Sequence, residues 1–314
     1  MGQNFWTKVP TPFFILAPMD DVTDVVFRQV IAKTGRPDIF FTEFTNVEGL
    51  NSKGREKLLP KLLFKKSEHP IVAQIWGKNP ENFYKTAKDL KVWGFDGIDL
   101  NMGCPEKSVV ANGACSALIE NHALAKEIIE ATLEGAGGLP VSIKTRIGLK
   151  DIKTKEWISF LLGFDLAAIT IHARTSKEMS KVPAHWDEIL KAVKIRDSLS
   201  PGVLIIGNGD IKSYAQGLEY AKLYKVNGIM IGTGIFSDPW VLNKGQWEHS
   251  RKERLELLLF HARLFNETWG SSKNFNILKK FFKIYVSDFE GAAELRVKLM
   301  ETKNLEQVEK IIKL

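Results

Sequence analysis

The chain has 314 residues, of which 44% are hydrophobic and 26% are charged. This is the composition of an ordinary globular protein, and it excludes the disordered, collagen-like and low-complexity classes. The 44 Lys and Arg residues exceed the 37 Asp and Glu residues, which gives a formal charge of +7. Such a surplus favours a polyanionic partner without identifying one.

Cysteine usage and the start of the chain bear on the compartment. Cys104 and Cys115 are the two cysteines, too few for a disulfide framework, so a reducing compartment is expected. The start has no basic flank followed by a long apolar stretch, and no later apolar run approaches about 18 residues. We therefore expect a soluble, cytoplasmic protein that does not enter a membrane.

Up to about residue 244, short apolar runs alternate with longer amphipathic stretches, a pattern typical of buried parallel strands joined by helices. Eight strand-helix units predict a TIM (β/α)8 barrel. A doubly wound open sheet is the competing architecture, but no G-x-G-x-x-G turn follows the first run. In chain order the runs are FFILAPMD (13–20), DIFFTEF (38–44), PIVAQIWG (70–77), GIDLNMG (97–103), PVSIKTRIG (140–148), LAAITIHAR (166–174), GVLIIGNGD (202–210) and GIMIGTGIF (228–236).

After residue 244 the strand-like runs stop and helical spacing takes over. Asn304 with Gln307 resembles a capping box, and an apolar stripe precedes it, formed by Leu255, Leu258, Leu259, Ala262 and Phe265. We therefore predict a barrel domain at 1–244 followed by a small all-helical domain at 245–314. Lysines of this tail could contact phosphates, although a solvated charged face is the default interpretation; they are Lys279, Lys280 and Lys283.

Functional side chains gather where the predicted strands end, which is where TIM barrels carry their active sites. A cation on a buried strand, such as Lys144, is costly unless a ligand balances it. With its neighbours it predicts a site for electron-rich or anionic groups. The strand-end residues are Ala17, Pro18, Met19, Gln74, Asn101, Cys104, Lys144, Arg146, His172 and Arg174.

The last two strands end in glycine-rich tips. Glycine permits close backbone approach and tight turns that present N–H groups to an anion. Because barrels frequently bind phosphate after strands seven and eight, a phosphate-bearing ligand is predicted here. The tip residues are Asn208, Gly209 and Asp210 after the seventh strand, and Gly232, Thr233 and Gly234 after the eighth.

Cys104 lies in a turn directly after a strand and is followed by Pro105. An unperturbed thiol has a pKa of about 8.5, so near neutrality Cys104 could donate a proton, or act as a nucleophile where its thiolate is stabilised. Cys115 is interpreted as a small buried hydrophobe. No ligand spacing for a metal stands out, and no G-x-S-x-G elbow supports a serine hydrolase.

Taken together, these segments resemble the tRNA-dihydrouridine synthases, in order and spacing across the barrel. GAAELR (291–296) extends the resemblance into the tail. The most specific part is DGIDLNMGCP (96–105). The others are APMDDVTDVVFR (17–28), FFTEF (40–44), AQIWG (73–77), SIKTRIG (142–148), ITIHART (169–175), GNGDI (207–211) and GIMIGTGIFSDPW (228–240).

The resemblance implies an FMN enzyme that takes a hydride from NADPH, with NADH as an alternative reductant, and reduces a uridine of the tRNA D-loop to 5,6-dihydrouridine. Cys104 would be the proton donor, and Thr233 stands where the family commonly has an arginine. Asn101, Arg146 and Arg174 would bind the uracil. FMN would contact Ala17, Pro18, Met19, Gln74, Lys144, His172, Asn208, Gly209, Asp210, Gly232 and Thr233.

Two other functions fit the same residues. A flavin barrel that reduces a small pyrimidine or enone would use the same chemistry, but it would leave the basic tail unexplained. A tRNA-binding protein without catalysis would account for Thr233, but it would leave the thiol and the buried lysine without a role. tRNA is the partner expected from the resemblance, and no protein partner is implied, so a monomer is expected.

Overall fold

The structure is a computed structural model that describes residues 4–245 and 248–312. The extreme ends of the two predicted domains, 1–3 and 313–314, and residues 246–247 lie outside this description. The chain divides into two compact units. The first consists of residues up to 25, 37–211 and 215–232, and the second consists of 26–36, 212–214 and the chain from 233 onward.

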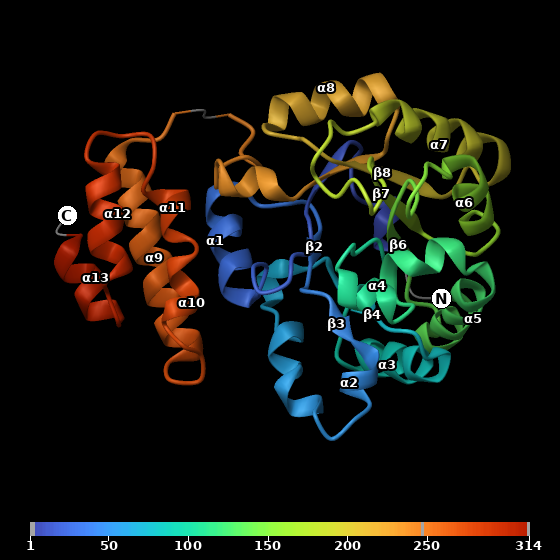
Figure 1. The fold of residues 1–314 in the computed structure, drawn as a ribbon, viewed down its shortest axis with the longest axis horizontal. Coiled ribbons are helices and arrows are strands. Elements are labelled where there is room, and N and C mark those ends of the chain that lie inside the picture. Colours follow the sequence, from blue (N-terminus) through green and yellow to red (C-terminus); the bar gives the residue numbers. More distant parts are fainter. Residues whose placement is uncertain (1–3, 246–247, 313–314) are drawn as a thin grey trace. The chain divides into compact units, whose positions relative to one another are not determined.

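The first unit is built on a parallel sheet that curls into a nearly closed barrel (Figure 1). An isolated parallel bridge between Ile15 and Ile39 joins the two edges of the sheet. The predicted TIM barrel is thereby confirmed, and the open-sheet alternative is wrong. The strands, in spatial order, are β1 (Phe13–Leu16), β9 (Gly228–Ile231), β8 (Leu204–Asn208), β7 (Ala168–His172), β6 (Val141–Arg146), β5 (Gly97–Met102), β4 (Ile71–Trp76) and β2 (Phe40–Phe41), with β3 (Thr45–Asn46) also paired to β4.

The register of the strands brings the functional side chains to one end of the barrel. Asn101 on β5 pairs with Lys144 on β6, and Arg146 on β6 pairs with His172 on β7. His172 in turn pairs with Asn208 on β8. Because parallel strands all end at the same rim, these residues of distant sequence lie next to one another.

Below this polar rim, the barrel interior is apolar. Side chains on a strand alternate between its two faces, so every second residue points inward and fills the interior. Trp6, from the short helix η1 (Phe5–Thr7), is 2% exposed and packs against Phe13 and Phe41. The interior cluster consists of Trp6, Phe13, Ile15, Ala17, Ile39, Phe41, Val72, Ala168, Ile206 and Met230.

Helices follow the strands, and Figure 1 shows α3, α5, α6, α7 and α8 outside the barrel. Asn79 caps α3 by accepting a hydrogen bond from the N–H of Asn82, and Pro80 occupies the first turn, where its lack of an N–H costs nothing. The helices of this unit are α2 (Val47–Leu50), η2 (Arg55–Lys57), η3 (Leu59–Leu62), η4 (Lys66–Glu68), α3 (Pro80–Val92), α4 (Lys107–Ala111), η5 (Cys115–Glu120), α5 (His122–Ala136), α6 (Thr154–Leu161), α7 (Trp186–Leu199) and α8 (Tyr214–Tyr224).

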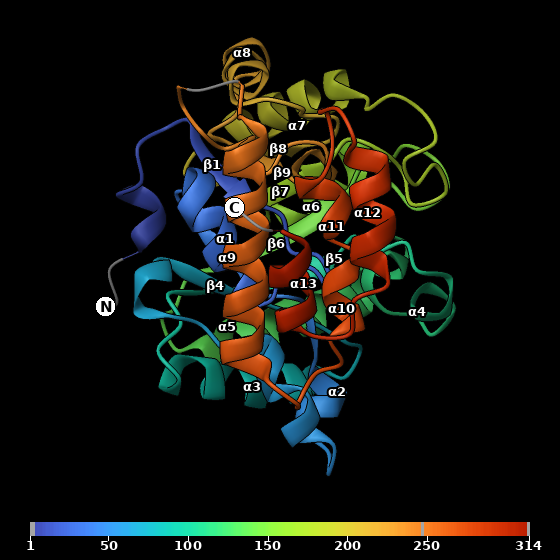
Figure 2. The same cartoon turned by 90° about the vertical axis from the view of Figure 1, so that its left-hand side faces the viewer.

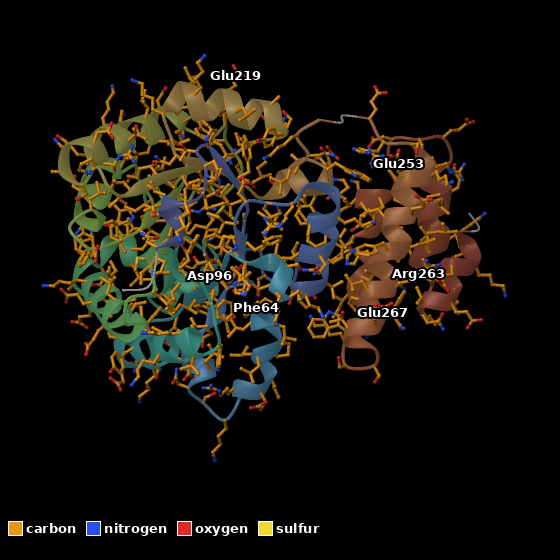
Figure 3. All side chains as sticks on the ribbon, turned by 180° about the vertical axis from the view of Figure 1, so that it is seen from behind. Phe64, Asp96, Glu219, Glu253, Arg263 and Glu267 are labelled. Atoms are coloured by element: carbon orange, nitrogen blue, oxygen red, sulfur yellow. The ribbon has the colours of Figure 1, made fainter. Side chains whose placement is uncertain are left out.

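The second unit is helical. The stripe from Leu255 to Phe265 is buried along the longest helix, α9, which packs against α11 and α13 (Figure 2). Charged residues of α9 include Glu253, Arg263 and Glu267 (Figure 3). The helices are α1 (Val25–Gly35), η6 (Thr233–Phe236), α9 (Arg251–Trp269), α10 (Asn276–Lys279), α11 (Phe282–Tyr285), α12 (Ala292–Met300) and α13 (Leu305–Ile311). Within the described residues, no helix has the length and apolar character needed to cross a membrane.

Candidate active site

Three cationic side chains and a thiol meet at the carboxyl ends of β5, β6 and β7. The charges of Lys144, Arg146 and Arg174 all act on His172. Those of Arg146, Asp99 and the Cys104 thiolate act on Lys144. The residues predicted on separate strands therefore form one electrostatic cluster.

His172 is neutral in this cluster. Burial, and then the positive charges of Arg146, Lys144 and Arg174, lower the pKa of His172 far below its ordinary value. A guanidinium nitrogen of Arg174, Nη1, lies 3.3 Å from its Nε2. Because arginine can only donate, Nε2 is the acceptor and Nδ1 carries the proton. The imidazole can therefore donate a hydrogen bond from Nδ1.

Lys144 is a cation that the negative charge of Asp99 stabilises from a distance, without a direct ion pair. Its Nζ donates a hydrogen bond to Oδ1 of Asn208 at 3.3 Å, and no carboxylate in the described part of the chain forms an ion pair with it. Burial, followed by the charge of Arg146, lowers the pKa of Lys144 to about 8. The side chain is suited to an electron-rich or anionic ligand, which would supply the direct partner that no carboxylate of the described residues provides.

Cys104 sits on a loop that Asn101 holds from β5. Oδ1 of Asn101 accepts hydrogen bonds from the backbone N–H groups of Gly103 at 3.1 Å and Cys104 at 3.0 Å. On the other side, the hydroxyl of Ser116 donates to the carbonyl of Cys104 at 2.9 Å. The backbone that carries the thiol is therefore fixed at its N–H and at its carbonyl.

The thiol of Cys104 has a second thiol as its hydrogen-bond partner. The pKa of Cys104 is lowered to about 7, and the main cause is this hydrogen bond from Cys115. Burial opposes the shift, whereas the N–H of Glu106 and the charge of Arg146 add to it. Cys115 is 0% exposed, as expected of a small hydrophobe. Its contact with Cys104 was not predicted, because nothing in the sequence pairs the two residues.

A second group that sequence reasoning missed lies beneath this loop. Asp99 on β5 is completely buried. Its Oδ1 accepts a hydrogen bond from the hydroxyl of Ser142 at 2.6 Å, and its Oδ2 accepts one from Nε2 of Gln74 at 2.7 Å. Burial raises the pKa of Asp99 to about 6. Gln74 then accepts from Nδ2 of Asn101 at 3.1 Å.

Arg146 braces the same loop from β6. Its Nε donates to the carbonyl of Gly103 at 2.8 Å, and its Nη1 donates to the carbonyls of Thr175 at 3.1 Å and Met179 at 3.2 Å. Burial lowers the pKa of Arg146 to about 10, which leaves it charged near neutrality. Arg146 therefore places a positive charge beside the Cys104 loop.

Arg174 and Asp210 form an ion pair. Nη2 of Arg174 donates to both carboxylate oxygens of Asp210, at 2.6 and 2.5 Å. The N–H of Ala184 also donates to this carboxylate, at 2.9 Å. These two residues were predicted for different ligands, uracil and FMN, and the structure places them in direct contact.

The glycine-rich tips leave room at the rim. Gly209 has a φ of +133°, and a Cβ there would meet the ring of His172 at 3.3 Å, so glycine is required. At Gly232 the nearest atom to such a Cβ would be Cβ of Ala17 at 3.6 Å. Thr233 follows Gly232, begins η6 and is exposed.

The end of β1 completes the rim. The N–H of Ala17 donates to the carbonyl of Ile231 at 2.8 Å, which joins β1 to β9. Ala17 and Pro18 are buried, whereas Met19 is half-buried. The N–H of Met19 donates to the hydroxyl of Thr23 at 2.9 Å. This segment forms a rigid edge of the site.

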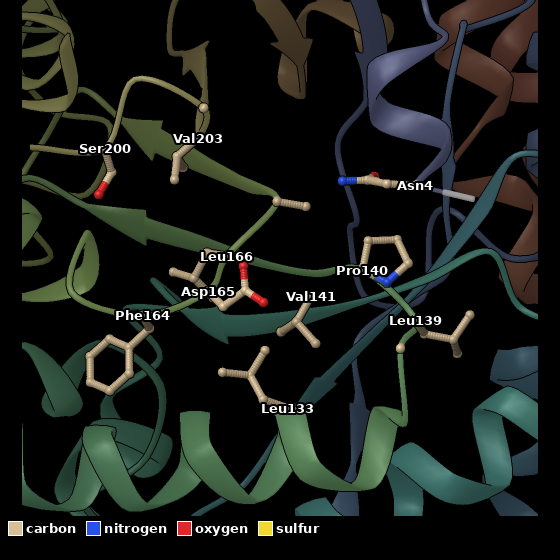
Figure 4. Close-up of a pocket in the computed structure, with 13 residues that line it drawn as sticks. Asn4, Leu133, Leu139, Pro140, Val141, Phe164, Asp165, Leu166, Ser200 and Val203 are labelled. Carbon is tan, nitrogen blue, oxygen red and sulfur yellow. The ribbon is translucent and has the colours of Figure 1, made fainter. Parts of the chain in front are cut away.

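Two other features lie apart from these residues. A cavity of about 540 Å³ lies at the amino-terminal ends of β6, β7 and β8, the opposite end of those strands, and its lining includes Leu139, Asp165 and Val203 (Figure 4). Three carboxylates approach one another closely at Asp20, Asp21 and Glu43, and Lys61 forms an ion pair with Asp20. Neither feature contains a predicted site residue.

The fold and the site define a (β/α)8 barrel with a cationic, thiol-bearing mouth. Residues 15–313 match the family model described as dihydrouridine synthase (Dus). The chain belongs to the dihydrouridine synthase family, which confirms the resemblance seen in its motifs.

Similar proteins extend over almost the whole chain. "Probable tRNA-dihydrouridine synthase 2" of Bacillus subtilis (strain 168) is 48% identical over 315 residues, which cover 99% of this chain and 96% of that protein. "Probable tRNA-dihydrouridine synthase" of Staphylococcus aureus (strain Mu50) is 48% identical over 316 residues, covering 99% and 95%. A solved structure, the old yellow enzyme homologue from Zymomonas mobilis, has a TM-score of 0.50 and 14% identity, covering 73% of this chain and 89% of that one. This last similarity concerns the fold alone.

Proposed function

We propose that the protein is an FMN-dependent tRNA-dihydrouridine synthase that reduces a uridine in the D-loop of tRNA, with NADPH as reductant and Cys104 as proton donor. The observation that carries this proposal is the thiol of Cys104, held on a fixed loop within a cluster of cations and hydrogen-bond donors. The family and the two relatives supply the substrate class.

The residues at the mouth suit FMN by their chemistry. Lys144 is a half-buried cation without an ion-pair partner in the described residues. The hydroxyl of Thr170, its register partner on β7, is buried and unpartnered within the same described set. When bound, FMN supplies the hydride that NADPH provides. The residues proposed to hold it are Gln74, Lys144 and His172 at the ring, Ala17, Pro18 and Met19 at its edge, and Asn208, Gly209, Asp210, Gly232 and Thr233 at the ribityl and phosphate groups.

Cys104 supplies the proton. Hydride addition at C6 of uracil builds negative charge at C5 and the carbonyl oxygen, and a positioned acid must protonate C5. A pKa of about 7 leaves a large share of Cys104 as thiol near neutrality and makes it a competent acid. The thiolate left behind is stabilised by the Cys115 thiol, the N–H of Glu106 and the charge of Arg146.

Three side chains are proposed to bind the uracil. The side-chain amide of Asn101 donates one N–H to Gln74, and its second N–H is available for the uracil. Arg146 keeps donors beyond those used on backbone carbonyls. Arg174 is held by Asp210, which fixes its guanidinium. Donors of this kind suit the carbonyl oxygens of uracil, where negative charge develops in the reaction.

The substrate must present its base to the barrel mouth. A base stacked inside a helix cannot be reached, so an exposed tRNA loop and an extruded uridine are proposed. We further propose residues 1–244 as the catalytic domain and 245–314 as the tRNA-binding domain of a cytoplasmic monomer. The tail carries 13 basic and 10 acidic residues, and exposed Lys280 and Lys283 are its proposed phosphate contacts.

A comparison of two cysteine variants tests the role of Cys104. In Cys104→Ala we expect NADPH to bleach bound FMN as in the wild type, while dihydrouridine formation in unmodified tRNA falls by at least about a hundredfold. Cys115→Ala is the matched control, and it should retain measurable turnover. Full activity of Cys104→Ala would refute the proposed proton donor, and reduction of free uridine as fast as tRNA would favour a small-pyrimidine reductase.

A further inference from the structure

A chain of hydrogen bonds runs between the adjacent strands β4 and β5 and into the Cys104 loop. It starts at Asp99, which accepts from Nε2 of Gln74 at 2.7 Å. Oε1 of Gln74 accepts from Nδ2 of Asn101 at 3.1 Å. Oδ1 of Asn101 accepts from the backbone N–H groups of Gly103 and Cys104. All three side chains are at most 7% exposed, so water does not compete effectively for these bonds.

The two ends of this chain determine its direction. Backbone N–H groups only donate, so they require the oxygen of Asn101 to face them. Nδ2 of Asn101 must then face Gln74 and donate to its Oε1. Nε2 of Gln74 consequently faces Asp99 and donates to its carboxylate. A carboxylate only accepts, so it completes the sequence without conflict. The side-chain amides of Gln74 and Asn101 could each be turned by about 180° with little change of shape. The hydrogen-bonding requirements at the two ends of the chain allow only one orientation of each amide.

We propose that Asp99 is a positioning residue for the reaction, and that its acceptor oxygen acts through Gln74 and Asn101 to hold the backbone of Cys104. This inference rests on the proposed role of Cys104 as proton donor. We call this chain of hydrogen bonds, from Asp99 through Gln74 and Asn101 to the Cys104 backbone, the relay. Because Gln74 and Asn101 also belong to the proposed FMN and uracil contacts, the relay orients their remaining N–H groups toward the site.

Variants at Asp99 show whether its oxygen is needed as a hydrogen-bond acceptor or whether its side chain only fills space. Asp99→Leu keeps a similar shape but removes the acceptor, whereas Asp99→Asn can keep an oxygen toward Gln74 and turn its nitrogen toward the hydroxyl of Ser142. Ser142→Ala is the matched control, because it removes the other partner of Asp99 and leaves the relay intact. The readout is amide hydrogen exchange at Gly103 and Cys104, measured by nuclear magnetic resonance in the FMN-loaded protein.

We expect Asp99→Leu to speed exchange at both amides by at least about tenfold, since a buried hydrogen bond to a charged group is lost. Asp99→Asn and Ser142→Ala should stay within about threefold of the wild type. Unchanged protection in Asp99→Leu would overturn the proposal. Exchange in Asp99→Asn or Ser142→Ala as fast as in Asp99→Leu would also overturn it, because the acceptor oxygen would not be the cause.

A second pair of variants covers the case in which Asp99→Leu does not fold. In Gln74→Glu, a carboxylate oxygen faces the carboxylate of Asp99, and neither group can donate a hydrogen bond to the other. Adding Asp99→Asn supplies an N–H that donates to the carboxylate at position 74, whose other oxygen still accepts from Asn101. The double variant should therefore exchange at least about tenfold more slowly at Gly103 and Cys104 than Gln74→Glu alone. Equal or faster exchange in the double variant would overturn the proposal.

A kinetic measurement separates this inference from the proposed function. In Asp99→Leu, or in Gln74→Glu where Asp99→Leu does not fold, dihydrouridine formation at saturating tRNA should slow by about tenfold, with tRNA affinity within about threefold of the wild type. A loss confined to tRNA affinity would contradict a role at Cys104. A wild-type protein that forms no dihydrouridine would refute the proposed function, yet the exchange measurements would still decide whether the relay exists.

Discussion

Replacing Cys115 with alanine removes the thiol that donates a hydrogen bond to Cys104, and we expect the pKa of Cys104 to rise. This hydrogen bond is the largest cause of the low pKa of Cys104, about 7. Cys115 is suited to this task because its hydrogen bond to Cys104, then burial and the charge of the Cys104 thiolate, raise its own pKa far above the ordinary range. It therefore remains a thiol, and a donor, throughout the working pH range.

The size of the effect follows from the strength of such a bond. A hydrogen bond to an ionised group contributes about 1.5–3 kcal/mol, and one pKa unit corresponds to about 1.4 kcal/mol. We therefore expect the pKa of Cys104 to rise by at least about one unit. At pH 7 the thiolate fraction of Cys104 would then fall from about a half to about a tenth, roughly a fivefold decrease.

The assay is the rate of alkylation of Cys104 by iodoacetamide as a function of pH, because only the thiolate reacts. Cys115 is 0% exposed and should not react, and Cys104→Ser gives the background rate. Cys115→Ser is the matched control, since its hydroxyl can still donate and its backbone has the same left-handed conformation, with φ of +53°. In this variant the pKa should stay within about half a unit of the wild type.

The direction of the pKa shift of Cys104 also determines how the reaction rate depends on pH. In the proposed mechanism the thiol form of Cys104 donates the proton, so dihydrouridine formation in the wild type should decline as the pH rises through about 7. In Cys115→Ala this decline should move to higher pH. An alkylation pKa in Cys115→Ala equal to that of the wild type would refute the assignment of Cys115 as the donor to Cys104.

Three further predictions concern FMN and tRNA. Lys144→Met removes a cation from the barrel mouth and should lower the reduction potential of bound FMN by at least about 30 mV, measured by dye-coupled titration; an unchanged potential would contradict a role of Lys144 at the ring. Thr233→Arg should tighten FMN binding by about threefold or more, measured by fluorescence quenching, and weaker binding would contradict a phosphate near Thr233. Lys283→Glu should weaken tRNA binding by about threefold and flatten its salt dependence, whereas Lys194→Glu on α7 should not; equal effects of the two would argue against a tail-specific contact.

The barrel could be predicted from the sequence because its signal is local. Each of the eight apolar runs became a strand or contained one, since a strand covered on both faces needs apolar residues throughout. The positions of Lys144 and His172 at the barrel mouth follow from the same reasoning, because parallel strands end at one rim. The register of the strands, in contrast, is seen only in the structure.

The partners of the site residues could not be predicted, because they depend on contacts between distant segments. Asp99 belongs to the most distinctive motif, but its partners Gln74 and Ser142 come from the two neighbouring strands. Cys115 meets Cys104 only through the path of the intervening loop. No local pattern specifies such contacts, so sequence reasoning proposed Cys104 as the proton donor without the groups that lower its pKa.

The proposed reaction is tested most directly by mass spectrometry of unmodified tRNA incubated with the FMN-supplemented protein and NADPH. We expect a gain of two hydrogens that maps to a single uridine in the D-loop, present with the wild type and absent with Cys104→Ala. No gain, in a preparation whose FMN is bound and bleached by NADPH, would contradict tRNA uridine as the substrate.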